Sequence, residues 1–276
     1  MSSREIPSAA PAMARERVSL AAWILRVGVA GCFIGHGAFG VITKSAWLPY
    51  FAVGGIGEPL AWALMPWIGA MDIAIGVIAL IRPTRPLLAW AVLWATWTAL
   101  CRPLAGEPFW ETLERAGNYG VPLAFLMMLG RERISFSRLA ETLDPATLTR
   151  LAWTLRLTTA TLLVGHAGLG LFTRKPGLTE HYRALWADSP AGTVAFVGAF
   201  EFALAAAVMV FPRPALLVGI ALWKLASESL FLAAGAPIWE VVERAGSYAA
   251  PLALAVLLFR RRRATLAPHL APPAVA

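Results

Sequence analysis

A motif of ionisable and aromatic residues, WExxERAGxY, stands near the end of each half of the sequence. It covers Trp110–Tyr119 and returns at Trp239–Tyr248, 129 positions later. On a helix, Glu111 and either Glu114 or Arg115 share one face. Carboxylates accept protons and a guanidinium donates hydrogen bonds, so the motif predicts a charged, aromatic vestibule. The alternative is structural: acidic helix caps, with Trp and Arg anchored at a membrane interface.

One histidine stands among small residues in each half, within GHGAFG (Gly35–Gly40) and GHAGLG (Gly165–Gly170). Small residues let helices approach closely, and an ionisable residue at membrane depth is a functional candidate. His36 and His166 could carry protons, ligate a haem or a metal, or donate a hydrogen bond to a quinone carbonyl. The alternative is a packing role beside a backbone carbonyl. No separate metal site is predicted, because the sequence has no HxxxH or CxxC spacing.

Further charges fall inside apolar segments. Arg26 and Asp72 of the first half correspond to Arg156 and Glu201 of the second. A charge within a membrane is costly unless it is paired. We therefore expect Arg26 to pair with Asp72, and Arg156 with Glu201, in a structural rather than a catalytic role.

The two halves differ within one segment. Where the first half has Ala95, Ala99 and Arg102, the second half has Lys224, Glu228 and Phe231, in that order. Lys224 and Glu228 stand four residues apart and would pair on one helix face. The halves are therefore not equivalent, and a site could be asymmetric.

Composition places the chain in a membrane. Of its 276 residues, 58% are hydrophobic and 14% are charged, against about 25% charged in soluble domains, and mean hydropathy is +0.65. The net charge of +8 does not indicate nucleic-acid binding, because the basic residues lie in short loops between apolar runs. Cys32 and Cys101 lie in or beside apolar runs, which favours packing. The sequence has no nucleotide-binding, serine-hydrolase or zinc-protease motif.

Eight apolar segments are predicted to cross a bilayer, which requires about 20 residues; the last segment of each half is short and must borrow from the amphipathic stretch before it. They are Val18–Thr43, Pro59–Ile81, Leu87–Leu104 and Ala116–Gly130 in the first half, and Leu151–Thr173, Gly192–Phe211, Ala215–Ala234 and Ala245–Phe259 in the second. An even number of spans gives both halves the same orientation. We predict an all-α, polytopic membrane protein with eight transmembrane helices as two parallel four-helix repeats.

The distribution of basic residues predicts orientation. Fourteen Lys and Arg residues lie on the side of the termini and seven on the other, and the excess marks the cytoplasm. We predict a multi-pass protein of a bacterial-type inner membrane, with both termini cytoplasmic and both motifs at the outer face. The predicted divisions are a disordered cytoplasmic tail (1–17), the first module (18–130), a cytoplasmic linker (131–150) with a helix-start signal at Asp144-Pro145, the second module (151–263) and a C-terminal tail (264–276).

Both halves share a pattern with one membrane family. An Arg opens the first span, a small-residue run ends in Gly and a basic residue, and an acidic residue precedes a Gly/Arg/Pro turn. The residues that carry it are Arg26, Gly31, Phe33, Gly35, Lys44, Asp72 and Arg82–Arg85, and then Arg156, Gly165, Arg174, Glu201 and Pro212–Pro214. In these residues the chain resembles the DoxX/DoxD-like proteins, which are four-helix units. The WExxERAGxY motif and the fusion of two units depart from that family.

The resemblance implies a function. Some DoxX/DoxD-like proteins act as the membrane subunit of thiosulfate:quinone oxidoreductase, so quinone is the implied cofactor. The implied partners are the lipid bilayer, a small redox substrate and a partner subunit. Our first hypothesis is a redox-linked, quinone-interacting membrane protein with a polar site at the outer face. The second is a transporter or channel for a small polar solute, with its site between the modules, and the third is a scaffold for a partner protein.

The predicted site lies at the outer face. We expect each histidine to face the Glu/Arg motif of its own module, with the motif aromatics as walls. The candidate catalytic residues are His36, His166, Glu111, Glu114, Arg115, Glu240, Glu243 and Arg244, and the candidate cofactor-binding residues are Trp110, Tyr119, Trp239 and Tyr248.

Overall fold

The structure is a computed structural model that describes residues 9–129, 143–173, 176–185 and 188–259. Every element in these ranges is a helix, which confirms the predicted all-α class. The first half contains α1 (Ala9–Val41), η1 (Ser45–Trp47), α2 (Leu48–Val53), α3 (Glu58–Ile81), α4 (Arg85–Leu104), α5 (Trp110–Glu114) and α6 (Ala116–Met128). The second half contains α7 (Pro145–Gly168), the π-helix η2 (Leu169–Thr173), α8 (Pro176–Ala184), α9 (Pro190–Val210), α10 (Pro214–Ala233), α11 (Trp239–Val242) and α12 (Ala245–Leu258).

Seven helical stretches of the described chain are long and apolar enough to cross a bilayer. They are Arg15–Val41, Glu58–Ile81, Arg85–Leu104, Pro145–Thr173, Pro190–Val210, Pro214–Ala233 and Trp239–Leu258. The chain is therefore a multi-pass membrane protein, as its composition predicts. The remaining predicted span corresponds to α6, which has 13 residues, fewer than the about 20 that a bilayer requires. Arg115 separates it from the short helix α5.

Prolines and caps set where several helices begin. α3, α4, α7, α9 and α10 each carry a proline in the first turn, where a missing N–H is tolerated. Asp144 accepts a hydrogen bond from the Thr147 amide at 2.9 Å, so the predicted helix start at Asp144-Pro145 is confirmed. α1 already begins at Ala9, so residues 9–17 of the predicted tail are helical. The predictions for residues 1–8, 131–142 and 264–276 fall outside the described ranges.

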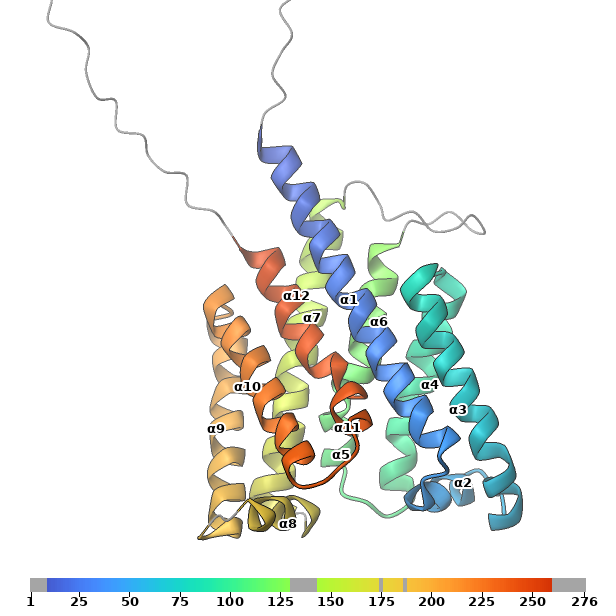
Figure 1. Cartoon of the computed structure of the whole chain (residues 1–276). Coiled ribbons are helices and arrows are strands. Elements are labelled where there is room, and N and C mark those ends of the chain that lie inside the picture. The colour runs from blue at the N-terminus through green and yellow to red at the C-terminus, as the bar shows by residue number, and fades with distance from the viewer. Residues whose placement is uncertain (1–8, 130–142, 174–175, 186–187, 260–276) are drawn as a thin grey trace, which may run out of the picture.

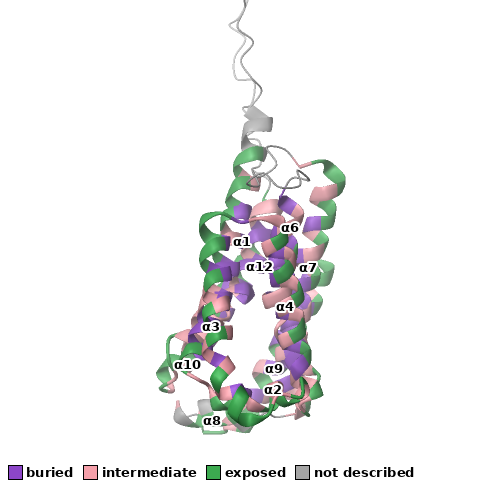
Figure 2. Ribbon diagram, turned by 90° about the vertical axis from the view of Figure 1, so that its right-hand side faces the viewer, coloured by how far each residue is buried: buried purple, intermediate pink, exposed green. Residues whose placement is uncertain are grey.

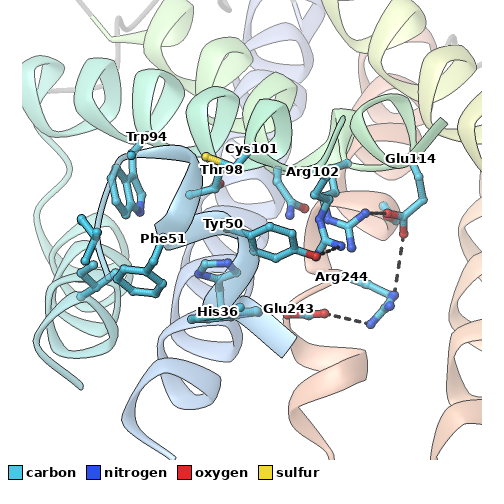
Figure 3. A pocket seen from close by; sticks show the side chains of 17 residues that line it. His36, Tyr50, Phe51, Trp94, Thr98, Cys101, Arg102, Glu114, Glu243 and Arg244 are labelled. Carbon is cyan, nitrogen blue, oxygen red and sulfur yellow. Dashed lines mark hydrogen bonds and ion pairs between the residues drawn. The ribbon is translucent and has the colours of Figure 1, made fainter. Parts of the chain in front are cut away.

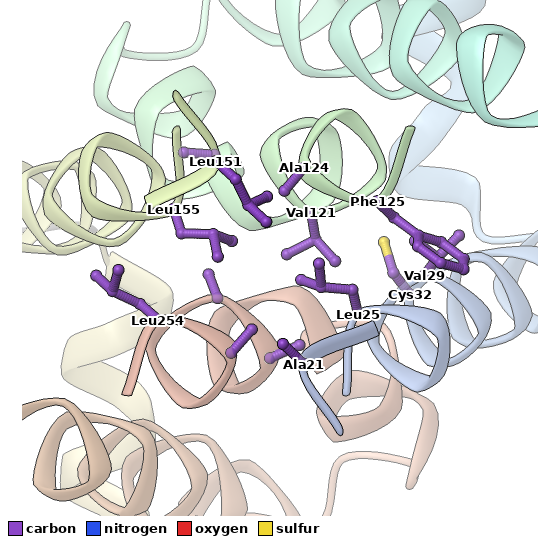
Figure 4. Packing of buried hydrophobic residues seen from close by; sticks show 14 of the residues in the cluster. Ala21, Leu25, Val29, Cys32, Val121, Ala124, Phe125, Leu151, Leu155 and Leu254 are labelled. Atoms are coloured by element: carbon purple, nitrogen blue, oxygen red, sulfur yellow. The ribbon is translucent and has the colours of Figure 1, made fainter. Parts of the chain in front are cut away.

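Four helices, α1, α6, α7 and α12, form the centre of the bundle (Figure 1). Their apolar side chains pack into one cluster, in which Leu25, Phe125, Leu155 and Leu254 are buried (Figure 4). The helices α3 and α4 lie on one side of this centre, and α9 and α10 lie on the other (Figure 1). The core is therefore shared between the two halves of the chain.

The outer faces of the bundle carry large apolar side chains. Trp67 and Phe196 are 76% and 74% exposed, and exposed residues run along the outer helices (Figure 2). Lipid tails are as apolar as these side chains, so the exposure is favourable in a bilayer. This is the surface of a protein surrounded by lipid.

The two halves interlock. α1 packs against α12 as well as α3, and α7 packs against α5 and α6 as well as α9. Gly35 in α1 touches the backbone of Glu243, and Gly165 in α7 touches the backbone of Glu114. A Cβ added at Gly35 or Gly165 would lie only 2.3 or 2.0 Å from those amide nitrogens. Each histidine-bearing helix is therefore covered by the motif of the opposite half.

The glycine of each motif has a packing role. Gly117 in α6 and Gly246 in α12 lie against each other, and a Cβ on Gly117 would come within 2.7 Å of the Gly246 carbonyl carbon. Residues without side chains let two helix backbones touch. The two motif copies therefore meet at the centre of the bundle.

The two predicted arginine pairs are wrong. The Arg156 Nε donates to the Val208 carbonyl at 3.0 Å, and the same guanidinium also reaches the Met209 carbonyl. Carbonyls in the last turn of a helix lack intrahelical partners and attract cations, so Arg156 caps α9 instead of pairing with Glu201. The Arg26 guanidinium lies 4.5 Å from the Trp23 ring centroid, and Asp72 binds His36 instead.

Candidate functional site

A cavity of about 140 Å³ lies in the first half, at the end of the bundle that carries α2, α5, α8 and α11. We call this end the motif end and this cavity the first cavity. Its aromatic wall comes from η1, α2 and α4 and consists of Trp47, Tyr50, Phe51 and Trp94 (Figure 3). Its charged wall consists of Arg102, Glu114, Arg115, Glu243 and Arg244. The cavity therefore pairs an apolar side with an ionic one.

His36 lines the first cavity and is fixed from two sides. Its Nδ1 lies 2.8 Å from Oδ2 of Asp72, which is fully buried. A carboxylate only accepts hydrogen bonds, so Nδ1 donates to it. The imidazole also stacks on Trp47, with ring centroids 4.5 Å apart. The Asp72 carboxylate and the Trp47 ring therefore fix the orientation of the imidazole in the cavity wall.

Carboxylates orient the arginines of the charged wall. Arg115 donates to Glu111 at 2.7 Å and to Glu114 at 2.5 Å. Arg102 donates to the Tyr50 hydroxyl at 2.8 Å and to Glu107 at 3.1 Å. Burial raises the pKa of the Tyr50 phenol, whose hydroxyl donates to Glu107. The guanidiniums are thus held in place before any ligand arrives.

A second, smaller cavity of about 50 Å³ lies in the second half. It is lined by side chains that include His166, Tyr182, Glu201, Lys224, Ser227 and Glu228. The predicted Lys224–Glu228 pair is confirmed, with Nζ 2.9 Å from Oε1. Lys224 also lies 3.2 Å from Glu201, so an ammonium and two carboxylates fill this region.

The two halves use corresponding tryptophans differently. The Trp223 Nε1 donates to Glu201 at 3.0 Å. Its counterpart, the Trp94 Nε1, is buried and has no hydrogen-bond partner among the described residues, and the same is true of Asp72 Oδ1. Asp72, which corresponds to Glu201, is one methylene shorter. The first half therefore leaves one buried donor and one buried acceptor unsatisfied, and each such group carries a free-energy cost.

His166 contacts the motif of the opposite half, which corrects the pairing predicted within the second module. The His166 Nε2 lies 3.3 Å from Glu114 of the first motif and 3.3 Å from Glu228. In the first cavity, His36 is joined by Glu243 and Arg244 of the second motif as well as by residues of its own. The cause is the interlocked packing, in which α5 covers α7 and α11 covers α1.

Glu114 and Arg244 connect the two cavities. Glu114 lines the first cavity and contacts His166, which lines the second. Arg244 lines the first cavity, and its Nε lies 2.8 Å from Glu228 in the second. Arg244 is further held by Glu240 at 2.7 Å and by Glu243 at 3.1 Å. One buried network of charges therefore spans both halves.

The four motif aromatics do not line either of these cavities. Trp110 stacks on Phe172, with centroids 5.4 Å apart, and Trp239 packs against a cluster around Trp47. The hydroxyls of Tyr119 and Tyr248 donate to backbone carbonyls of their own halves, at 3.2 and 3.1 Å. Their predicted role as cavity walls is therefore wrong, and they stabilise the motif helices instead.

The actual aromatic wall was missed by the sequence reasoning. Tyr50 and Phe51 belong to the short helix α2 between α1 and α3, which folds back over the cavity (Figure 3). The signal for them was the aromatic segment 47–51, which lies between the first two predicted spans. Arg102, already noted as an asymmetric position, is another cavity residue that was not predicted.

Within the described ranges, no group of three His, Cys, Asp or Glu side chains is arranged to hold a metal ion. Cys32 and Cys101 are free and buried, and Cys101 lines the first cavity. No protein-family model, curated protein or solved structure matches the chain.

Proposed function

We propose that the chain binds a small polar solute in the first cavity, as the binding step of transport across the membrane. One observation carries the proposal: ionisable side chains from both halves, Arg115 and Arg244 among them, converge on a single cavity. Sites between structural halves are typical of transporters, in which one half moves against the other. A scaffold protein would not require such a cavity.

The cavity residues divide the work of binding. Arg102 and Arg115 are fixed donors that can bind an anionic or carbonyl group. His36, supported by Asp72, can accept or donate a hydrogen bond and can take up a proton. The aromatic wall would contact the apolar part of the solute. The interlocked network through Glu114 and Arg244 would transmit the occupancy of the first cavity to the second half.

The proposal includes an architecture and an orientation. We propose eight spans in two parallel repeats, with α5–α6 as the shortest span, in a bacterial-type inner membrane. Both termini would be cytoplasmic, so the motif end would face outward. A cysteine introduced at Gly106, in the loop before α5, should react with an impermeant reagent added from outside. Labelling only after the membrane is opened would reverse this orientation.

A cavity-blocking variant tests the binding function. Thr98 lines the first cavity, so Thr98→Trp should fill it. Leu93 lies on the same helix and is 65% exposed, so Leu93→Trp is the matched control. In proteoliposomes screened with labelled sugars, amino acids, organic acids and polyols one at a time, uptake should be lost in Thr98→Trp and kept in Leu93→Trp. If no solute enters, or if Thr98→Trp transports normally, the proposed function is wrong.

A quinone headgroup is the second candidate ligand. The unpartnered indole N–H of Trp94, beside three other aromatic side chains, favours a flat ring with a carbonyl acceptor. The DoxX/DoxD-like resemblance points the same way, toward a redox-linked membrane subunit. Decylubiquinone should then quench the protein's tryptophan fluorescence in wild type but not in Thr98→Trp. Equal quenching in both proteins would reflect partition into the detergent and reject this candidate.

A further inference from the structure

Three carboxylates surround His166 in the second half. Its Nε2 lies 3.3 Å from Glu114 and 3.3 Å from Glu228, and its Nδ1 lies 3.9 Å from Glu201. These side chains come from α5, α10 and α9, so one imidazole on α7 joins helices of both halves. The three carboxylates are at most 7% exposed, and salt screens buried charges much less than exposed ones.

The contacts of His166 favour a charged ring. Its Nε2 is buried and has no aligned hydrogen-bond partner among the described residues, although two carboxylates lie 3.3 Å away. A neutral ring would gain little from contacts of this geometry, and its lone pair would be repelled by any oxygen that it faces. An imidazolium carries a proton on both nitrogens and is attracted to all three carboxylates. The surroundings therefore stabilise the protonated form.

The cations near His166 do not cancel this preference. Three of them bind its carboxylates, namely Lys224 of α10 and the residues that precede α6 and α12, Arg115 and Arg244. The two arginines also bind Glu111, Glu240 and Glu243. With Lys44 on Glu240 and Arg102 on Glu111, six glutamates of the described chain share five cations. A protonated His166 supplies a sixth positive charge.

The first half does not repeat this arrangement. Among the ion pairs of the described residues, His36 has one carboxylate partner, Asp72 at 2.8 Å. The position of Glu228 is occupied by Ala99 in the first half. A cluster of three carboxylates around a histidine is therefore a property of the second half.

The second cavity gives protons a route to His166. It has a volume of about 50 Å³, and the hydroxyl-bearing residues Tyr182 and Ser227 line it together with the histidine. A polar cavity needs only about 10–15 Å³ to hold a water molecule, so water fits beside the ring. The helix α8, which contributes Tyr182, lies at the motif end (Figure 1). A proton can arrive there as hydronium, form the second N–H bond of the ring, and return to water.

Glu114 joins the surroundings of His166 to the first cavity. One of its oxygens lies 2.5 Å from Arg115 and the other 3.3 Å from His166, and Glu114 and Arg115 both line the first cavity. A solute in that cavity displaces water from these side chains, and charges interact more strongly where water is excluded. Filling the first cavity therefore changes the proton affinity of His166. By reciprocity, the proton changes the affinity for the solute by the same factor.

We propose that His166 is a proton-binding site whose proton is coupled to the occupancy of the first cavity, so that protons and solute move together or in exchange. The inference rests on the proposed transport function and adds the coupling ion. While the ring is protonated, it holds α5 of the first half against α9 and α10 of the second. As the pH rises and the proton leaves, Glu114, Glu201 and Glu228 lose this shared cation and the contact between the halves loosens.

¹⁵N NMR of the purified full chain, labelled at histidine, tests the proton directly. The two ring nitrogens of an imidazolium have similar chemical shifts, whereas those of a neutral ring differ widely. The signal of His166 is assigned by replacing the other three histidines of the sequence, which are His36, His181 and His269. We expect both nitrogens of His166 to be protonated at neutral pH. A neutral His166 at that pH would overturn the proposal.

A charge-removing variant tests the cause. Glu228→Gln should lower the proton affinity of His166 at least about tenfold, because it removes an opposite charge within 4 Å. Glu180→Gln is the matched control, since Glu180 is 61% exposed and pairs with Arg183 on α8. Equal proton affinities of His166 in Glu228→Gln and wild type would overturn the proposal. If Glu228→Gln does not fold, the wild-type spectrum decides alone.

The coupling is tested by filling the first cavity from within the chain. The indole of Thr98→Trp occupies the cavity, so the proton affinity of His166 should differ at least about fivefold between Thr98→Trp and its control Leu93→Trp, as is typical of coupled sites. Equal affinities would overturn the coupling.

The outcome for the proposed function is separate. If the labelled sugars, amino acids, organic acids or polyols enter proteoliposomes but an imposed pH gradient leaves their uptake by wild type unchanged, the transport function stands and the proton coupling is wrong. If His166 carries its proton and responds to Thr98→Trp while none of these solutes enters, the proton site stands and the transport function fails.

Discussion

The two halves of the chain share an arrangement of helices but differ in the side chains that line their cavities. In both, a histidine contacts an acidic residue on the next long helix, with nitrogen–oxygen distances of 2.8 Å for His36 and 3.9 Å for His166. The first half leaves a cavity of about 140 Å³, and the second leaves about 50 Å³. Lys224 and Glu228 of α10 line the smaller cavity, whereas Thr98, Cys101 and Arg102 of the corresponding helix α4 line the larger one. A duplicated arrangement of helices can thus keep a larger cavity in one half and fill much of the other cavity with its own side chains.

The stability of the second half depends on buried charges that compensate one another around the smaller cavity. Lys224, Glu201 and Glu228 are each at most 2% exposed. Burying charges in this way costs desolvation free energy, which only close partners offset. The corresponding positions of the first half are Ala95 and Ala99, which carry no charge and need no such partners. The second half should therefore be much more sensitive to single charge removals than the first.

The largest effect is expected for Lys224→Ala. Removing this ammonium leaves Glu201 and Glu228 without their shared cation, which should destabilise the fold by about 3–5 kcal/mol. The melting temperature of the purified protein should fall sharply. Combining Lys224→Ala with Glu228→Ala should recover part of the loss, because one of the stranded charges is removed. A melting temperature within error of wild type for the single variant would contradict the role of this pair.

An intermediate effect is expected where a histidine-bearing helix meets the opposite motif. Gly165→Ala would push its Cβ into the Glu114 backbone and should cost about 1–3 kcal/mol, as overpacking does. Gly35→Ala should behave alike, because its Cβ meets the Glu243 backbone. Gly219→Ala is the control, since nothing lies within 4 Å of its added Cβ. Equal melting temperatures for all three variants would show that the halves are not tightly interlocked.

The smallest effect is expected for Asp72→Glu. The added methylene should let this carboxylate reach Trp94 Nε1, as Glu201 reaches Trp223 in the second half. One new hydrogen bond should stabilise the protein by about 0.5–1.5 kcal/mol. The indole N–H proton resonance of Trp94, assigned with Trp94→Phe, should shift downfield. Glu201→Asp is the reciprocal control and should break the hydrogen bond from the Trp223 indole N–H. An unshifted Trp94 resonance in Asp72→Glu would show that the added methylene does not bring the carboxylate to Trp94.

Periodicity and composition predicted most of the individual helices. Apolar runs interrupted by prolines located α3, α4, α9 and α10, because a membrane helix needs about 20 apolar residues and proline favours its first turn. The spacing of Lys224 and Glu228 predicted their pairing, since residues four apart on a helix are neighbours. These features are local, so the sequence contains them directly.

Neighbour relations between helices were not predictable in the same way. Apolar helices fit many partners, so nothing in the pattern around His166 indicated that α5 of the other half would cover it. Arg156 was expected to pair with Glu201 because both residues lie at a similar depth. Sequence spacing does not show that carbonyls at the end of α9 are free to accept hydrogen bonds. The cavity-lining roles of Trp94 and Tyr50 were not predicted, because an aromatic residue in an apolar run is also typical of a side chain that contacts lipid.

The exchange of motif helices between the halves also bears on how the protein is made. α1 enters the membrane first, but α11, which covers its histidine, is among the last helices to leave the ribosome. The first cavity therefore stays incomplete during most of synthesis, and its charged wall must wait for a segment about 200 residues downstream of His36. Chains are made from the N-terminus and domains generally fold as units in that order. Here the unit that folds is the whole chain. A truncated product would expose an incomplete first cavity to the proteases and chaperones of the membrane.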